Sequence, residues 1–248
     1  MYIRKAWLIL SLFLFQNLHA TEKKDTLRIL FVGNSYVYYN NLAQLITVLS
    51  DSMDTKLVCT KSTLGGGSLS DHWNSRKGLR TRELLDTKHY NIVVLQDNSL
   101  WPIEHADSVL YYGSLFCEAI KKKGEKVFLY NTWSRKKTPE TQEQINTTYL
   151  QLAQQCNATL VPVGNCWAKM RKLNKDAELY FTDEHHPSYL GTFLTALCFI
   201  KKITGKLPHG YAKVFNYWDR DGEFFRIMQV SDEEIKQCTQ VVNEVVDN

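Results

Sequence analysis

Five short, almost uninterrupted apolar runs recur along the chain, and they limit its possible folds more than any other feature. Stretches with helical spacing of apolar residues separate them. The runs are Leu27–Gly33, Lys56–Thr60, Asn91–Gln96, Lys126–Asn131 and Thr159–Gly164. Strands of this composition are typical of a parallel sheet whose two faces are covered by helices. We therefore predict an α/β fold, a three-layer αβα sandwich around a central, mostly parallel five-stranded sheet.

The segments between the runs carry helical patterns. One begins after Gly33 and has apolar residues at helical spacing, and three more are expected near 105–123, 140–156 and 187–204. A last helix is predicted after Ser231, which forms a capping box with Glu234. Its apolar face would consist of Ile235, Cys238, Val242 and Val245.

A group of aromatic residues precedes this last helix. Such a group could line a sugar site, but it more often covers a hydrophobic core, and we favour the core. Its members are Tyr211, Phe215, Tyr217, Trp218, Phe224 and Phe225.

Residues 1–20 have the layout of a secretory signal peptide. Arg4 and Lys5 form a positive start, Ala6–Phe15 is an apolar stretch short for a bilayer span, and Ala20 suits a cleavage site. We predict a periplasmic or secreted protein, with residues 21–248 forming one domain and no stable membrane insertion after cleavage. Retention of the segment as a membrane anchor is the alternative.

Charge and cysteine content exclude several classes of function. Without Arg4 and Lys5 the chain has 28 basic and 26 acidic residues and no basic stripe, so nucleic acid is not an expected partner. The six cysteines include no C-x-x-C pair and no zinc-like spacing. Cys59, Cys117 and Cys198 lie at positions expected to be apolar core. Disulfide pairing and oligomeric state stay open.

Polar residues gather where the predicted strands end. Ser35 follows the first strand, Gly65–Gly67 the second and Asn98 the third, while Asp183 and His186 precede the helix after Pro187. Ligands of open α/β sheets bind at the carboxyl ends of the strands. Alone, each residue has a commoner explanation as a helix cap, a flexible loop or a turn residue. Together they supply a nucleophile, a base, an orienting acid and oxyanion donors, the parts that acyl transfer requires.

These blocks resemble the SGNH/GDSL hydrolase family, whose fold is flavodoxin-like. "VGNSY" is similar to its serine block, "GGGS" to its second block, "LQDNS" to its third, and "TDEHHPSYLG" to its D-x-x-H-P block. The resemblance implies a Ser35–His186–Asp183 triad, with Asn98 and the backbone N–H of Gly67, or secondly Gly66, as oxyanion donors. The chain departs from the family pattern at three positions, with Asn34 for a frequent Asp, Gln96 for Gly and Ser99 for Asp.

The stretch Thr182–Gly191 also allows a metal site, because Glu184, His185 and His186 are potential ligands. Adjacent side chains point apart, however, and no distant further ligand suggests itself. An Asp183–His186 proton relay needs only that the carboxylate hold the imidazole of the same loop. We favour the relay and expect neither a metal nor another cofactor.

Taken together, the sequence predicts an exported serine esterase for a small-molecule or carbohydrate ester, with O-acylated carbohydrate as the favoured substrate class. Two other functions stay open, a non-catalytic carbohydrate-binding protein on the same fold and a metal-dependent hydrolase.

Overall fold

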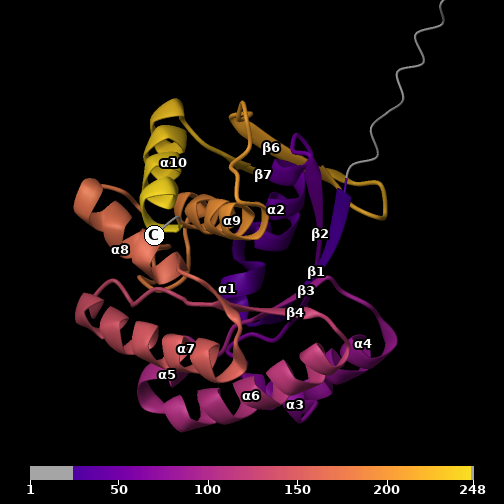
Figure 1. Ribbon diagram of the computed structural model, residues 1–248. Coiled ribbons are helices and arrows are strands. Elements are labelled where there is room, and N and C mark those ends of the chain that lie inside the picture. The colour runs from indigo at the N-terminus through magenta and orange to yellow at the C-terminus, as the bar shows by residue number, and fades with distance from the viewer. Residues whose placement is uncertain (1–24, 247–248) are drawn as a thin grey trace, which may run out of the picture.

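A computed structural model describes residues 25–246, and its centre is a five-stranded sheet (Figure 1). All strand pairs of this sheet are parallel, and the spatial order is β2-β1-β3-β4-β5. The strands are β1 (Asp25–Gly33), β2 (Thr55–Thr63), β3 (Ile92–Leu95), β4 (Lys126–Tyr130) and β5 (Thr159–Val161). The predicted α/β class and five-stranded sheet are confirmed.

Helices cover both faces of the sheet and make three layers (Figure 1). One face packs against α3 (Leu69–Trp73), α4 (Thr81–Thr87), α5 (Trp101–Glu104), α6 (Ala106–Lys122) and α7 (Gln142–Cys156). The other packs against α2 (Leu42–Ser50), α8 (Val163–Leu173), α9 (Tyr189–Thr204) and α10 (Asp232–Val246). The short α1 (Ser35–Tyr38) follows β1, and three 3-10 turns complete the helices at Tyr39–Asn41, Arg76–Gly78 and Pro139–Thr141.

Side chains of the strands alternate between the two cores. In β1, Ile29 and Phe31 belong to the core under α2 and α9, whereas Leu30 and Val32 belong to the core over α6 and α7. All four are fully buried. Burial on both faces explains why the sequence reads as continuous apolar runs rather than as alternating ones.

The fifth strand is shorter than the sequence predicts. β5 ends at Val161, and Val163 and Gly164 open α8 instead. Pro162 separates the two because it lacks an N–H for the sheet and its fixed φ suits the start of a helix. Four helices, α3, α4, α5 and α8, were not predicted, because the first three are short and the fourth follows its strand without a turn signal.

The aromatic group forms an antiparallel hairpin of β6 (Val214–Trp218) and β7 (Phe224–Gln229). Phe215 is buried in the core, as expected for a core cover. Trp218 and Phe224 instead lie opposite each other at the hairpin end, with 65% and 55% of their surface exposed and ring centroids 4.8 Å apart. The capping box of α10 forms, since Ser231 N donates to Glu234 Oε2 at 2.7 Å and Glu234 N to Ser231 Oγ at 3.2 Å.

All six cysteines are free thiols. Cys117 and Cys198 are buried as predicted, and Cys59 lies half-buried inside β2 rather than at its end. Within residues 25–246 no helix is long and apolar enough to cross a bilayer. The predicted signal peptide, residues 1–20, lies outside the described residues, so export stays a prediction.

Candidate active site

The sheet order creates one place where loops from neighbouring strands diverge. β1 lies between β2 and β3, and the order 2-1-3-4-5 reverses direction there. Crevices at such switch points, at the carboxyl ends of the strands, are the usual ligand sites of doubly wound folds. Ser35 begins α1 two residues after β1 ends, Gly65–Gly67 follow β2, and Asn98 follows β3. The predicted residues of these three segments therefore share one edge of the sheet.

A hydrogen-bonded chain joins Ser35 to the loop before α9. His186 Nε2 lies 2.7 Å from Ser35 Oγ, and His186 Nδ1 lies 2.6 Å from Asp183 Oδ2. With the Nδ1 proton donated to the carboxylate, Nε2 is free to accept the serine proton. Ser35 caps no helix, because Asn34 is the N-cap of α1 and accepts from Tyr36 N at 3.0 Å.

Asp183 is suited to holding His186. Partial burial would raise the pKa of its carboxyl group, but the His186 side chain and the backbone N–H groups of His186 and His185 donate to it. These bonds outweigh burial and lower the pKa to about 2. The carboxylate is thus ionised at neutral and mildly acidic pH, and it can stabilise an imidazolium at His186.

The loop that carries this pair is tied down on several sides. Glu184 has a left-handed backbone, with φ of 65°, which turns the chain so that Asp183 and His186 face each other. Phe181 N donates to His186 O at 2.8 Å, and Asn40 Nδ2 donates to Pro187 O at 2.9 Å. The ring of Tyr39 stacks on that of His186, with centroids 4.0 Å apart. His186 therefore has little freedom to leave Ser35.

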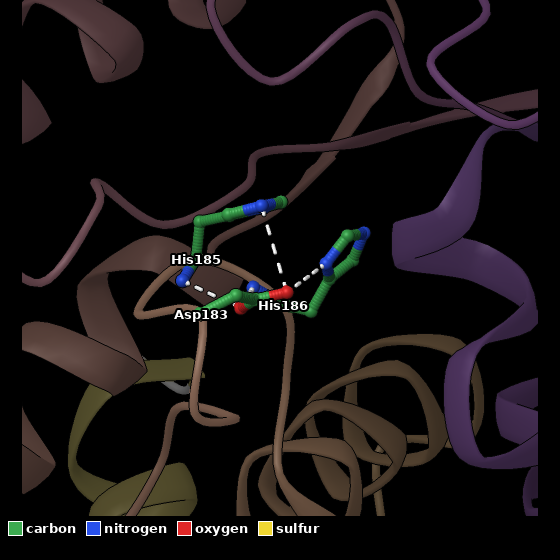
Figure 2. A group of neighbouring side chains, drawn as sticks. All are labelled: Asp183, His185 and His186. Carbon is green, nitrogen blue, oxygen red and sulfur yellow. Dashed lines mark hydrogen bonds and ion pairs between the residues drawn. The ribbon is translucent and has the colours of Figure 1, made fainter.

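Among the described residues, this loop contains one group of three side chains close enough together to hold a metal ion, Asp183, His185 and His186. Figure 2 shows both imidazole rings facing the carboxylate of Asp183. Two ligands of a tetrahedral zinc ion lie about 3.3 Å apart, given bonds of about 2.0 Å. The 2.6 Å between His186 Nδ1 and Asp183 Oδ2 is instead a hydrogen-bond distance. Glu184, the third ligand considered from sequence, pairs with Lys137 at 2.7 Å, so the residues present fit a relay better than a metal.

Oxyanion donors are available around Ser35. Among the described residues, the N–H groups of Ser35 and Gly66 have no backbone or side-chain acceptor, whereas Gly67 N donates to Leu64 O at 2.9 Å. Asn98 Nδ2 donates to Gly66 O at 2.9 Å, which uses one of its two hydrogens. The N–H of Gly67, the first choice from sequence, is already hydrogen-bonded within the turn. This favours Gly66, the second choice, as the oxyanion donor.

Two departures from the family pattern form one hydrogen-bonded unit beneath the site. Asn34 Nδ2 donates to Gly67 O at 3.1 Å and to Asp97 O at 3.3 Å, so it links the segments after β1, β2 and β3. Gln96 Oε1 accepts from Asn34 N at 2.9 Å. A Cβ at Gly33 would lie 2.4 Å from that oxygen, which explains the glycine. Sequence reasoning found the departures at Asn34 and Gln96 but not the contact between them.

Comparisons with known proteins agree with this architecture. No family model and no curated protein matches the chain. Among solved structures, a candidate SGNH hydrolase from Slackia heliotrinireducens is 25% identical, with a TM-score of 0.61 over 71% of this chain and 98% of that one. A DUF4886 family protein from Bacteroides uniformis is 14% identical, with a TM-score of 0.70 over 90% and 95%. An acetylxylan esterase from Geobacillus stearothermophilus is 17% identical, with a TM-score of 0.58 over 76% and 99%. The chain has an SGNH-hydrolase-like fold, as the resemblance implied.

Proposed function

We propose that the protein is an exported serine esterase in which Ser35, His186 and Asp183 act as a triad. The observation that carries the proposal is the continuous pair of hydrogen bonds, 2.7 Å and 2.6 Å long, from Ser35 Oγ through His186 to Asp183. Its place at the switch point of the sheet supports it further. An SGNH-hydrolase-like fold, with esterases among its structural neighbours, makes ester hydrolysis the natural chemistry.

The reaction begins with attack of Ser35 Oγ on the acyl carbon while His186 Nε2 takes the hydroxyl proton. The tetrahedral oxyanion would receive the N–H groups of Ser35 and Gly66 and the second amide hydrogen of Asn98. Each such donor lowers the barrier by about 3 kcal/mol in comparable sites. His186 then protonates the leaving alcohol, and a water molecule activated by the same imidazole hydrolyses the acyl-enzyme.

O-acylated carbohydrate is the substrate class we favour. A cavity of about 570 Å³ combines aromatic and amide side chains, among them Trp133, Asn146, Asn165 and Tyr180. No triad residue lines this cavity, and its link to the loop of His186 is Trp133, whose Nε1 donates to His185 O at 3.0 Å. Such a mixture suits the apolar faces and hydroxyl groups of sugars. Several neighbouring structures are named as acetylxylan esterases, at 16–17% identity.

A hydrolysis screen tests the proposal. Purified protein is incubated with p-nitrophenyl esters of increasing chain length and with acetylated sugars, beside the Ser35→Ala variant. The wild type should hydrolyse the short esters, and the variant should keep its fold but lose turnover. Residual turnover of the variant beyond a trace, with contamination excluded, would rule out the serine mechanism. Binding of sugars by a wild type without any hydrolysis would point to the carbohydrate-binding alternative.

A further inference from the structure

The segment after β4 places one arginine beside the candidate active site. The segment is hydrogen-bonded to the His186 loop on both sides of Arg135, once through a side chain and once through the backbone. Trp133 Nε1 donates to His185 O at 3.0 Å, and Lys136 N donates to Glu184 O at 3.0 Å. Arg135 is therefore held in a defined place rather than on a free loop.

The Arg135 side chain has no hydrogen-bond or ion-pair partner among the residues that the structure describes. Its Nε is buried without an acceptor, and its guanidinium makes no ion pair or hydrogen bond with any residue from 25 to 246. The nearby Arg171 differs, since it donates to Tyr180 Oη at 3.2 Å and to Lys136 O at 3.4 Å. Arg171 thus has a structural task, and Arg135 has none within the described chain.

Two further polar atoms of neighbouring segments are buried and have no hydrogen-bond partner within residues 25–246. They are Tyr36 Oη and His185 Nδ1. The rings of Tyr36 and His185 lie near each other, with centroids 6.4 Å apart. Trp133, two residues before Arg135, contacts both residues, because its ring stacks on Tyr36 and its Nε1 donates to His185 O. Buried polar groups without partners are costly, and a ligand that accepted from the three would remove this cost.

The cluster lies next to the reacting atoms. Tyr36 follows Ser35 directly, and its ring centroid is 5.8 Å from that of His186. Tyr36 also stacks on Trp133 at 4.5 Å, which fixes its hydroxyl. A substrate with its acyl carbon at Ser35 Oγ would thus bring its nearby substituents within reach of this cluster.

We propose that Arg135, with Tyr36 Oη and His185, binds a carboxylate of the ester substrate, and that the enzyme prefers acidic esters. A guanidinium presents paired N–H groups that match the two oxygens of a carboxylate, and the tyrosine hydroxyl adds a third donor. This inference rests on the proposed esterase function and narrows its substrate class. The carboxylate can belong to the sugar or to the acyl group, and the experiment separates the two.

Matched substrates isolate the carboxylate. One pair is the 3-O-acetyl ester of methyl glucuronide and of methyl glucoside, which differ only at the sugar carboxylate. The other is p-nitrophenyl hemisuccinate and p-nitrophenyl butyrate, which have acyl chains of equal length. The wild type should show a kcat/KM about tenfold or more higher for the acidic member of one pair, the size of a charge-assisted hydrogen bond. No acidic preference in either pair overturns the inference.

Variants then assign the preference to Arg135. Arg135→Gln should bring the ratio within the preferred pair to about 1, and Arg135→Lys should keep part of it because it retains the charge without the fork. Lys136→Gln removes the adjacent, exposed charge and serves as the control, with the ratio unchanged. Equal loss of preference in the Gln variants of Arg135 and Lys136 would assign it to the general positive field and contradict the inference.

Binding provides a readout that does not require turnover. Calorimetry compares methyl glucuronide and succinate as probes with the wild type and with Arg135→Gln. At least one probe should bind the wild type about tenfold more tightly than the variant. If no ester is hydrolysed but this difference is present, the esterase proposal fails while the carboxylate site stands. If esters are hydrolysed and neither probe distinguishes the two proteins, only the carboxylate site is refuted.

Discussion

Asp97 lies under the candidate site and gives the fold a definite pH dependence. Its carboxyl group is completely buried one residue before Asn98. Oδ1 accepts from Leu69 N at 3.1 Å and from Asn98 N at 2.7 Å, but Oδ2 has no partner. Burial raises the pKa to about 7, against the lowering effect of the two hydrogen bonds. Asp97→Asn keeps the accepting oxygen and removes the charge.

The sign follows from the two pKa values. The carboxyl group has a pKa of 3.8 in the unfolded chain and of about 7 in the folded protein. Between these two pH values the folded state therefore binds more protons than the unfolded state. Stability therefore falls as pH rises through this window, and the ionised carboxylate costs about 4 kcal/mol above it. Between pH 5 and pH 8 the wild type should lose about 3 kcal/mol relative to Asp97→Asn.

Urea unfolding measured from pH 5 to pH 8 tests this magnitude. The difference between wild type and variant isolates Asp97, because all other groups are common to both. Asp86→Asn, which changes an exposed carboxyl group of α4, controls for the substitution itself. If the difference in free energy of unfolding between wild type and Asp97→Asn stays constant from pH 5 to pH 8, the buried carboxyl group is not held protonated and the reasoning is refuted.

Three further outcomes are expected from the site geometry. His186→Ala should lower kcat by about a thousandfold or more, and His185→Ala only modestly, as steady-state hydrolysis would show; equal losses reversed by zinc would favour a metal site. Asn98→Asp, which replaces an oxyanion donor by an acceptor, should lower kcat about a hundredfold with little change in KM; a raised KM with kcat intact would make Asn98 a ground-state contact. Asp183→Asn should lower kcat by a thousandfold or more at pH 7, because the amide cannot stabilise the imidazolium; a rate within tenfold of wild type would remove Asp183 from the mechanism.

The strands and the shared edge could be predicted from sequence because both follow from simple rules. A sheet buried on both faces requires continuous apolar runs, and parallel strands bring their carboxyl ends to one edge. Ser35 and Asn98 were therefore placed together without knowledge of any contact. Ser35 and His186 are 151 positions apart in the sequence, and the structure places the two side chains in contact.

Other features depend on side-chain directions that sequence does not reveal. Whether Gly66 or Gly67 keeps a free N–H is decided by one turn hydrogen bond to Leu64. In the sequence, Arg135 is the first residue of the basic run Arg135–Lys137. In the structure, its buried Nε without an acceptor distinguishes it from the two lysines. Trp218 and Phe224 share the composition of a core cover, yet they lie at the exposed end of a hairpin.

Covalent trapping tests most directly whether Ser35 is the nucleophile. The protein is incubated with a fluorophosphonate, which reacts with serines activated by a neighbouring base, and the adduct is located by peptide mass spectrometry. A single adduct on Ser35 is expected, formed in step with the loss of ester hydrolysis and greatly slowed in His186→Ala. Complete loss of hydrolysis with the adduct on another residue, or full labelling without loss of activity, would contradict the Ser35 mechanism.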